Sequence, residues 1–180
     1  MPFPTELRTE RLLLRPWRSD DAVELLPILE ANRDHIGPWI PRRVADPMPV
    51  PQLGERLGAF AELFRVDREW RFAIISAHDA RMLGEVDLFP RNATGRVSFP
   101  ESDRVELGYW LRSDATGSGF VVEAARALLD AARAIKDFSH AEIRCDPRNA
   151  PSVAVARRLG FELVEETDGP LQVWMLRLSS

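Results

Sequence analysis

The feature that most constrains this chain is a glycine-rich turn, Asp114-Ala115-Thr116-Gly117-Ser118-Gly119-Phe120, that separates a strand-like run from a long helical pattern. The residue pattern predicts a strand over Val105–Leu111 and a helix over 118–136. A second apolar run, Ala141–Cys145, follows the helix and predicts another strand. Because crossover connections between strands of one sheet are right-handed and join parallel strands, we expect a parallel βαβ unit here.

The same turn is suited to hold an anion. Gly117 and Gly119 allow backbone N–H groups to converge, and the helix that follows presents its unpaired N–H groups and positive dipole end. Two glycines can equally form a plain tight turn. The dinucleotide fingerprint requires a third glycine where Val122 stands, and the Gly-Lys-Ser/Thr of the mononucleotide P-loop is absent. The turn therefore favours a phosphorylated cofactor of another kind.

Length and composition set broad limits. The chain has 180 residues, 45% of them hydrophobic, which predicts one domain spanning 1–180, and its net charge of −4 argues against a nucleic-acid partner. No apolar run is long enough to span a membrane and no apolar leader is present at the N-terminus, so we expect a cytoplasmic protein. The single cysteine, Cys145, is expected to be a buried, inert thiol, and the three scattered histidines predict no metal site.

The remaining elements predict a mixed α/β fold. In chain order they are a strand over Leu7–Trp17, a helix capped by Ser19–Asp21 with apolar positions at Val23, Leu26, Leu29 and Ile36, a proline-rich loop over Pro41–Pro51, a helix over Gln52–Val66, hairpin strands over Trp70–Ala77 and Met82–Phe89, a polar loop over Arg91–Asp103, a helix over Ser152–Leu159 and strands over Leu163–Thr167 and Gln172–Leu178.

Several motifs and their order resemble one known family. They are Thr9-Glu10-Arg11-Leu12-Leu13-Leu14-Arg15-Pro16, Glu106-Leu107-Gly108-Tyr109-Trp110-Leu111, Gly117-Ser118-Gly119-Phe120 with Glu123-Ala124, and Asn149-Ala150-Pro151-Ser152 with Leu159-Gly160-Phe161. Over nearly its whole length the chain resembles the GCN5-related N-acetyltransferase (GNAT) superfamily, in the branch of the ribosomal-protein alanine/serine N-acetyltransferases. The resemblance implies an α/β (α+β) fold with a mixed, mostly antiparallel sheet of about seven strands, a central parallel βαβ unit and about four helices.

The resemblance also implies acetyl-CoA as the acetyl donor. In the family the glycine turn holds the CoA pyrophosphate, while the strand before it separates from its parallel neighbour and bonds the pantetheine arm. Such an unpaired edge is costly unless a ligand fills the gap. The implied CoA-binding residues are Trp110, Leu111, Arg112, Gly117, Ser118, Gly119, Phe120, Asn149 and Ser152.

The chemistry needs a neutral amine, and therefore a base that takes a proton from the ammonium form directly or through water. Glu106 is the first candidate because it lies on the strand before the turn, beside Gly108, which leaves space on the same face. Glu85 and Asp87 on the neighbouring strand are alternatives. Glu106 could instead simply pair with a surface arginine.

The departing thiolate needs a proton, and Ser152 and Tyr109 are the candidate donors. Ser152 could also be an ordinary first-turn residue, Asn149 an ordinary helix N-cap, and Tyr109 a core residue. Many family members have a tyrosine acid seven residues after this asparagine, but here Ala156 occupies that position. Water could also serve, because a thiolate is a tolerable leaving group at neutral pH.

The expected acceptor is a protein or peptide N-terminal α-amine, whose pKa of about 8 makes the neutral form more accessible than that of a lysine at about 10.4. A small amine (a polyamine, an aminoglycoside or an amino acid) is the alternative acceptor. A non-catalytic acyl-CoA-binding sensor is the alternative function, suggested by Ala156. A homodimer is compatible with the resemblance, although no residue pattern argues for one.

Overall fold

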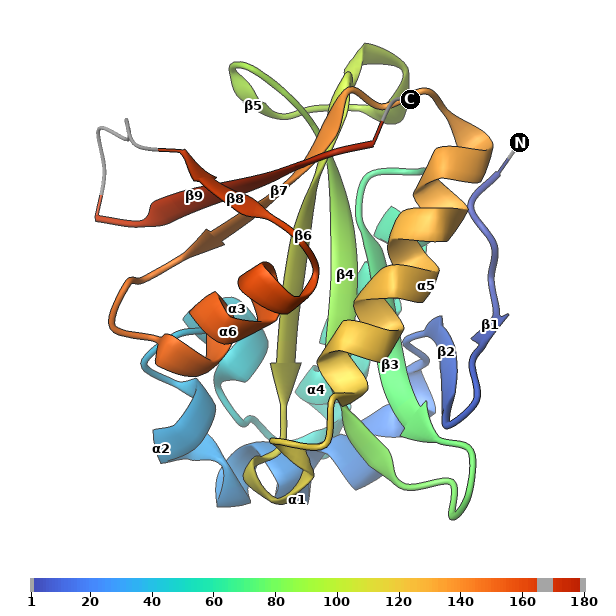
Figure 1. The fold of residues 1–180 in the computed structure, drawn as a ribbon. Coiled ribbons are helices and arrows are strands. Elements are labelled where there is room, and N and C mark those ends of the chain that lie inside the picture. The colour runs from blue at the N-terminus through green and yellow to red at the C-terminus, as the bar shows by residue number, and fades with distance from the viewer. Residues whose placement is uncertain (1, 165–169, 179–180) are drawn as a thin grey trace.

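One twisted sheet runs through the molecule (Figure 1). The computed structural model describes residues 2–164 and 170–178. Within them, the strands follow the order β1-β2-β3-β4-β6-β7-β9-β8, with β5 beside β4. Their bounds are β1 Leu7–Arg8, β2 Leu12–Pro16, β3 Trp70–Ser76, β4 Met82–Asn92, β5 Gly95–Arg96, β6 Arg104–Leu111, β7 His140–Cys145, β8 Glu162–Val164 and β9 Gln172–Arg177.

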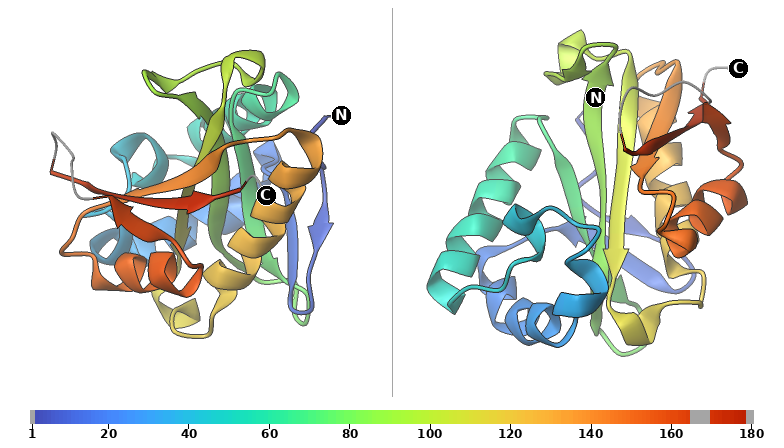
Figure 2. Two further views of the ribbon diagram at one scale, coloured as in Figure 1. Left: turned by 45° about the horizontal axis from the view of Figure 1, so that its top comes forward. Right: turned by 90° about the vertical axis from the view of Figure 1, so that its left-hand side faces the viewer.

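Helices cover both faces of the sheet (Figure 2). Helices α1 and α4 pack on one face, while α5 and α6 pack on the other. The α-helices of the described chain are α1 Ala22–Ala31, α2 Arg33–Ile36, α3 Arg42–Ala45, α4 Val50–Arg65, α5 Phe120–Ile135 and α6 Ala150–Arg158, and short 3-10 turns lie at Ser19–Asp21, Phe99–Glu101 and Ser113–Ala115.

Each face of the sheet has its own apolar core. Leu128 and Ala132 of α5 are fully buried against one face. On the other face, Leu53 and Leu57 of α4 pack with Trp110. Burying a leucine side chain contributes about 1.5–3 kcal/mol, so both helices are anchored mainly by these contacts.

The first predicted strand is divided into two. A turn at residues 9–12 separates β1 from β2, which pair as a hairpin with Leu7 opposite Leu14. The Thr9 backbone N–H donates to the Leu12 carbonyl at 3.0 Å, and the Leu12 N–H donates to Thr9 Oγ1 at 3.0 Å. The expectation of one continuous strand was wrong because this threonine satisfies the backbone locally.

The first predicted helix is interrupted at Asn32, whose φ of −113° ends α1. The Asn32 amide donates to the Ile28 carbonyl at 2.8 Å and accepts from the Ser113 N–H at 2.7 Å. Of the predicted apolar positions, Leu29 and Ile36 are buried, but Val23 is 68% exposed and Leu25 is buried in its place.

Other differences fall in the loops. The proline-rich segment holds the short helix α3, and α4 begins at Val50 because Pro51 fits the first turn of a helix. The polar loop after β4 contains the two-residue strand β5. Because of such short elements, the described chain has more strands and helices than the expected seven and four, or so. Residues 165–167 of a predicted strand lie outside the described residues.

The central βαβ unit forms as predicted. β6 and β7 are parallel and joined by α5, but they pair only at Val105 with Ala141 and at Glu106 with Glu142. Beyond these pairs the two strands diverge (Figure 1). Residues 107–111 therefore have no strand partner on the β7 side within the described chain, although β4 pairs with them on the other side.

Gly84 of β4 lets the chain approach β6 closely. A Cβ added at Gly84 would lie 2.1 Å from the Trp110 carbonyl oxygen, where only backbone movement could relieve the overlap. We therefore expect Gly84→Ala to lower the free energy of unfolding by about 1–3 kcal/mol in urea denaturation. Gly58→Ala is the control, since its Cβ meets only the rotatable Ser19 hydroxyl and alanine favours the helix. Equal stabilities of Gly84→Ala and the wild type would contradict the prediction.

Candidate active site

Two pockets meet where β6 and β7 diverge. One, of about 470 Å³, is lined by Glu85, Asp87 and Glu106, and we call it the acidic pocket. The other, of about 580 Å³, is lined by Gly117 and Gly119, and we call it the glycine pocket. Both volumes are typical of small-molecule sites. The two pockets share six lining residues: Trp39, Ile40, Tyr109, Trp110, Asn149 and Ser152.

The glycine pocket is built on the turn before α5. Gly117 and Gly119 have φ of +80° and +81°, which residues with a Cβ rarely adopt. A Cβ at Gly117 would have no described atom within 4 Å, so the turn leaves open space above it. Helix α5 begins at Phe120, which also lines the pocket, and its first N–H groups lack helical partners. This arrangement suits a bound anion, as the sequence predicts.

Arg11 and Glu123 hold this turn against the N-terminal hairpin. Glu123 accepts from Arg11 Nε at 2.7 Å and from Thr9 Oγ1 at 2.5 Å. The Arg11 Nη1 atom donates to the Ser118 carbonyl at 3.0 Å, and the guanidinium lies 4.7 Å from the centre of the Phe120 ring. The sequence motif contains these residues, but their contact across more than 100 positions was not predicted.

The unpaired edge of β6 is shared between the pockets. Trp110 lines both, and Leu111 lines the glycine pocket. Arg112 lies outside the lining that the described residues define. Its backbone N–H donates to the Leu83 carbonyl at 2.9 Å, and its Nε donates to Asp114 at 2.6 Å.

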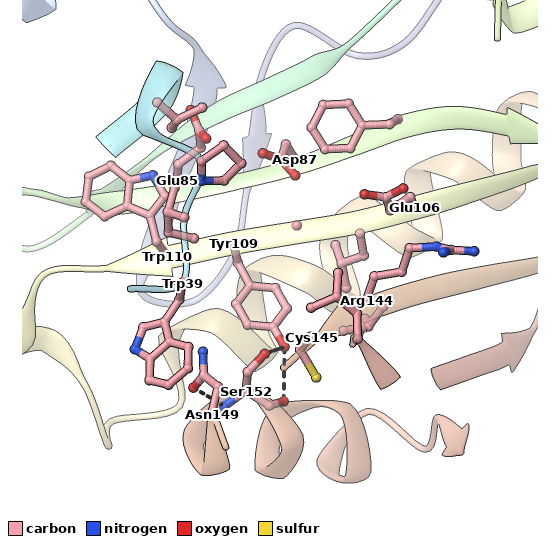
Figure 3. Close-up of a pocket in the computed structure, with 18 of the residues that line it drawn as sticks. Trp39, Glu85, Asp87, Glu106, Tyr109, Trp110, Arg144, Cys145, Asn149 and Ser152 are labelled. Atoms are coloured by element: carbon pink, nitrogen blue, oxygen red, sulfur yellow. Dashed lines mark hydrogen bonds between the residues drawn. The ribbon is translucent and has the colours of Figure 1, made fainter. Parts of the chain in front are cut away.

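Tyr109 and Ser152 are joined at the border of the two pockets (Figure 3). The two hydroxyl oxygens lie 2.9 Å apart, and the Tyr109 hydroxyl donates to the Ser152 carbonyl at 3.1 Å. Burial raises the pKa of Tyr109, so the phenol keeps its proton at neutral pH. Asn149 caps α6 by accepting from the Ser152 N–H at 3.2 Å, and Ala156 is buried inside that helix.

Cys145 ends β7 beside this pair (Figure 3). Its side chain lines the acidic pocket and is buried, as the sequence predicts. Burial raises the pKa of the thiol, which favours the protonated and less reactive form.

Glu106 lies in the acidic pocket with both carboxylate oxygens engaged. Oε1 accepts from Arg96 at 2.5 Å, and Oε2 accepts from Arg91. The residue is 9% exposed. The pairing with arginine that the sequence left open is therefore the arrangement that the structure contains.

A buried cationic centre occupies the neighbouring strands. Arg71 of β3 donates to Glu69 at 2.7 Å, to Glu85 at 2.9 Å and to Asp87 at 3.1 Å. Glu85 also accepts from Trp17 Nε1 at 2.5 Å. Neither Arg71 nor Trp17 was expected to contact the candidate carboxylates, because their contacts depend on strand order rather than on sequence spacing.

Asp87 is the least satisfied of these carboxylates. Its Oδ2 atom accepts from Arg71, but Oδ1 is buried and has no hydrogen-bond partner among the described residues. Burial raises the pKa of Asp87 well above the usual range, and the nearby charge of Glu85 acts in the same direction. A Cβ at Gly108 would lie 2.2 Å from Oδ1, so Asp87 occupies the space that glycine leaves on β6.

In residues 2–164 and 170–178, no three His, Cys, Asp or Glu side chains are grouped so that they could hold a metal ion. Nor does any helix in the described part have the length and apolar character needed to cross a membrane.

The family model "Acetyltransferase (GNAT) domain" matches residues 11–162. The chain therefore belongs to this family and is a GNAT acetyltransferase.

Individual relatives agree with this family assignment. The chain is 28% identical over 155 residues to "Probable N-acetyltransferase YjcK" of Bacillus subtilis, a match that covers 86% of this chain and 82% of that protein. The fold is similar to ribosomal-protein-S5-alanine acetyltransferase from Vibrio fischeri, with a TM-score of 0.78, 21% identity and 97% of each chain covered. It is also similar to Mycobacterium smegmatis RimJ in complex with CoA-disulfide, with a TM-score of 0.71, 24% identity and coverage of 92% of this chain and 81% of that one.

The Arg11–Glu123 contact yields a pH-dependent prediction. Its hydrogen bonds lower the pKa of Glu123 despite the opposing effect of burial. The ionised form therefore stabilises the fold above the ordinary glutamate pKa of about 4.3, and this contribution is lost as pH falls through the lowered value. We expect Glu123→Gln to lower the free energy of unfolding by about 1–3 kcal/mol at pH 7. The difference from the wild type should shrink below about pH 4. A difference that stays constant across this range in urea denaturation would contradict the prediction.

Proposed function

We propose that the chain transfers the acetyl group of acetyl-CoA to a primary amine, most specifically the N-terminal α-amine of a protein or peptide. The observation that carries the proposal is the meeting of two pockets at the Tyr109–Ser152 pair. One pocket has a turn suited to phosphates, and the other has carboxylates suited to an amine. Two reactants could thus approach each other from separate entrances.

The donor would occupy the glycine pocket. Its pyrophosphate would bind the N–H groups around Gly117, Ser118, Gly119 and Phe120, where a helix start and an open turn coincide. The pantetheine arm would lie along the unpaired edge at Trp110 and Leu111, as an added strand does. Arg158, which also lines this pocket, is exposed there and could pair with a phosphate.

The transfer itself is a direct attack of the amine nitrogen on the thioester carbonyl. The new N–C bond forms as the C–S bond breaks, and the thiolate then needs a proton. Tyr109 is protonated at neutral pH and is bonded to Ser152, so the two hydroxyls can pass a proton to the sulfur. Asn149 supports the pair by fixing the first turn of α6.

The charges of the acidic pocket favour an acceptor with a single positive charge. Four carboxylates line it, but so do five arginines: Arg43, Arg71, Arg91, Arg96 and Arg144. A polyamine would meet repulsion from this set, whereas a peptide N-terminus would bring one ammonium to the carboxylates. The name of the Vibrio fischeri protein, an S5-alanine acetyltransferase, is in line with a protein acceptor.

Binding of acetyl-CoA can be tested by calorimetric titration. Gly119→Glu would add bulk and negative charge at the phosphate position, so we expect its affinity to fall by at least about 100-fold. Gly160→Glu is a matched control because Gly160 has a similar φ of +83° and lies outside the lining of both pockets in the described chain. Equal affinities of the two folded variants would reject this position of the donor.

Acceptor choice can be tested with three amines at equal concentration. They are a peptide with a free N-terminal serine or alanine, the same peptide with a blocked N-terminus and an internal lysine, and spermidine. We expect the free N-terminus to be acetylated at least about tenfold faster than either alternative, because its amine has the lowest pKa and carries one charge. Faster transfer to spermidine would favour the small-amine alternative.

A further inference from the structure

We propose that Asp87, rather than Glu106, is the carboxylate that contacts the acceptor amine and takes its proton. The inference rests on the proposed function and concerns the chemistry of the acidic pocket. It follows from three features of the described residues: an unpartnered oxygen, the space that holds it, and the pairing of the competing carboxylate.

The unpartnered oxygen is the first feature. Asp87 is 4% exposed, and its Oδ1 atom has no hydrogen-bond partner within the described chain. A buried polar atom without a partner costs about 1–3 kcal/mol, so such atoms call for a reason. Asp87 forms part of the wall of the acidic pocket, and an amine bound there would supply the missing donor.

The space around this oxygen depends on Gly108. Asp87 lies opposite Gly108 in the antiparallel pairing of β4 and β6, so the carboxylate reaches across the neighbouring strand. Because a Cβ at Gly108 would approach Oδ1 to 2.2 Å, any other residue there would displace the carboxylate. The same glycine lines the acidic pocket, so the carboxylate forms part of the pocket wall beside β6.

Glu106 lacks such a free position. Each of its oxygens is bonded to an arginine, and an approaching ammonium would have to share an oxygen with Arg91 or Arg96 and face the positive charge of that arginine. Asp87 accepts one hydrogen bond from Arg71, which it shares with Glu69 and Glu85, and apart from that its carboxyl group faces the carboxyl group of Glu85. Asp87 is therefore the carboxylate whose coordination an ammonium would complete.

Burial also suits Asp87 to act as a base. The charged groups that face it are Arg71 on β3, Glu85 on β4 and Arg96 on β5. Burial and Glu85 raise its pKa more than the two arginines lower it. A carboxylate of raised pKa is a stronger base, and it accepts a proton from an ammonium at a smaller cost than an ordinary aspartate.

The protons balance in this scheme. One proton of the ammonium passes to Asp87, directly or through one water, and the nitrogen lone pair then attacks the thioester carbon. A second proton leaves the nitrogen for water as the C–S bond breaks, while the thiolate gains one proton from the Tyr109–Ser152 pair, which then regains one from water. Asp87 finally returns its proton to water, so the products are the amide, the free thiol and one released proton.

The test compares Asp87→Asn, Glu106→Gln and the wild type in acetyl transfer to a peptide with a free N-terminal serine. We expect Asp87→Asn to lower kcat about 100-fold at pH 6, two units below the amine pKa of about 8, because only about one amine in a hundred is neutral there without a general base. The loss of kcat in Glu106→Gln should be at least tenfold smaller than the loss in Asp87→Asn. The acetyl-CoA affinity of both variants should stay within about twofold of the wild type by calorimetry.

A pH profile separates a base from a structural residue. Without Asp87 only the neutral amine reacts, so the Asp87→Asn rate should rise about tenfold per pH unit up to the amine pKa of about 8 and approach the wild-type rate. A purely structural role would leave the ratio of the two rates unchanged with pH. That result would overturn the proposal.

Gly108→Ala provides a second variant if Asp87→Asn fails to fold. The added methyl displaces the Asp87 carboxylate but removes no charge, so the rate should fall while acetyl-CoA affinity is kept. Full activity in either folded variant, or an equal loss in Glu106→Gln, would overturn the assignment to Asp87 alone. No transfer by the wild type to any of the amines would overturn the proposed function itself.

Discussion

The pairing of β6 with β7 is the constraint on which the site depends. The two strands are held parallel by two residue pairs and then separate, while β4 continues to pair with β6 along its full length. The separation leaves the end of β6 without a partner on one side and lets the N-terminal end of α6 approach Tyr109. A fully paired sheet would satisfy more backbone groups, but it would close the passage between the pockets. The backbone groups of residues 107–111 therefore lack strand hydrogen bonds on the side where a ligand could supply them.

Arg71 holds the wall of the acidic pocket that contains Glu85 and Asp87. It is 3% exposed, bonded to three carboxylates, and lies 4.6 Å from the centre of the Phe60 ring and 4.8 Å from that of Phe89. A buried arginine requires such partners, since an unpaired buried charge is strongly destabilising. The three hydrogen bonds of Arg71 differ in length: those to Glu69 and Glu85 are the two shorter ones, and the one to Asp87 is the longest. The group that stabilises the wall thus leaves one carboxylate under-coordinated at the pocket.

Local patterns in the sequence predicted the parts of the site that depend on neighbouring residues. The βαβ unit, the glycine turn before α5, and the Asn149 cap that the sequence offered as one interpretation all follow from residue type and short spacing. The pairing of Glu106 with Arg91 and Arg96, and the contact of Arg11 with Glu123, depend on which strands and helices become neighbours. Strand order is set by the packing of the whole chain, so no local pattern contained it.

The alternation of side chains along the strands links these features. Glu106, Gly108 and Trp110 share one face of β6, and Asp87 lies opposite Gly108 on that face, whereas Tyr109 packs on the other face with Ser152. Asp87, the candidate base, and Tyr109, the candidate acid, therefore lie on opposite faces of the sheet. Two reactants that contact these two side chains would have to meet in the gap between β6 and β7. A shift of one residue between β4 and β6 would exchange these faces and move Asp87 away from Gly108. The strand register, which the apolar cores fix for stability, thereby also fixes where the side chains of Asp87 and Tyr109 lie.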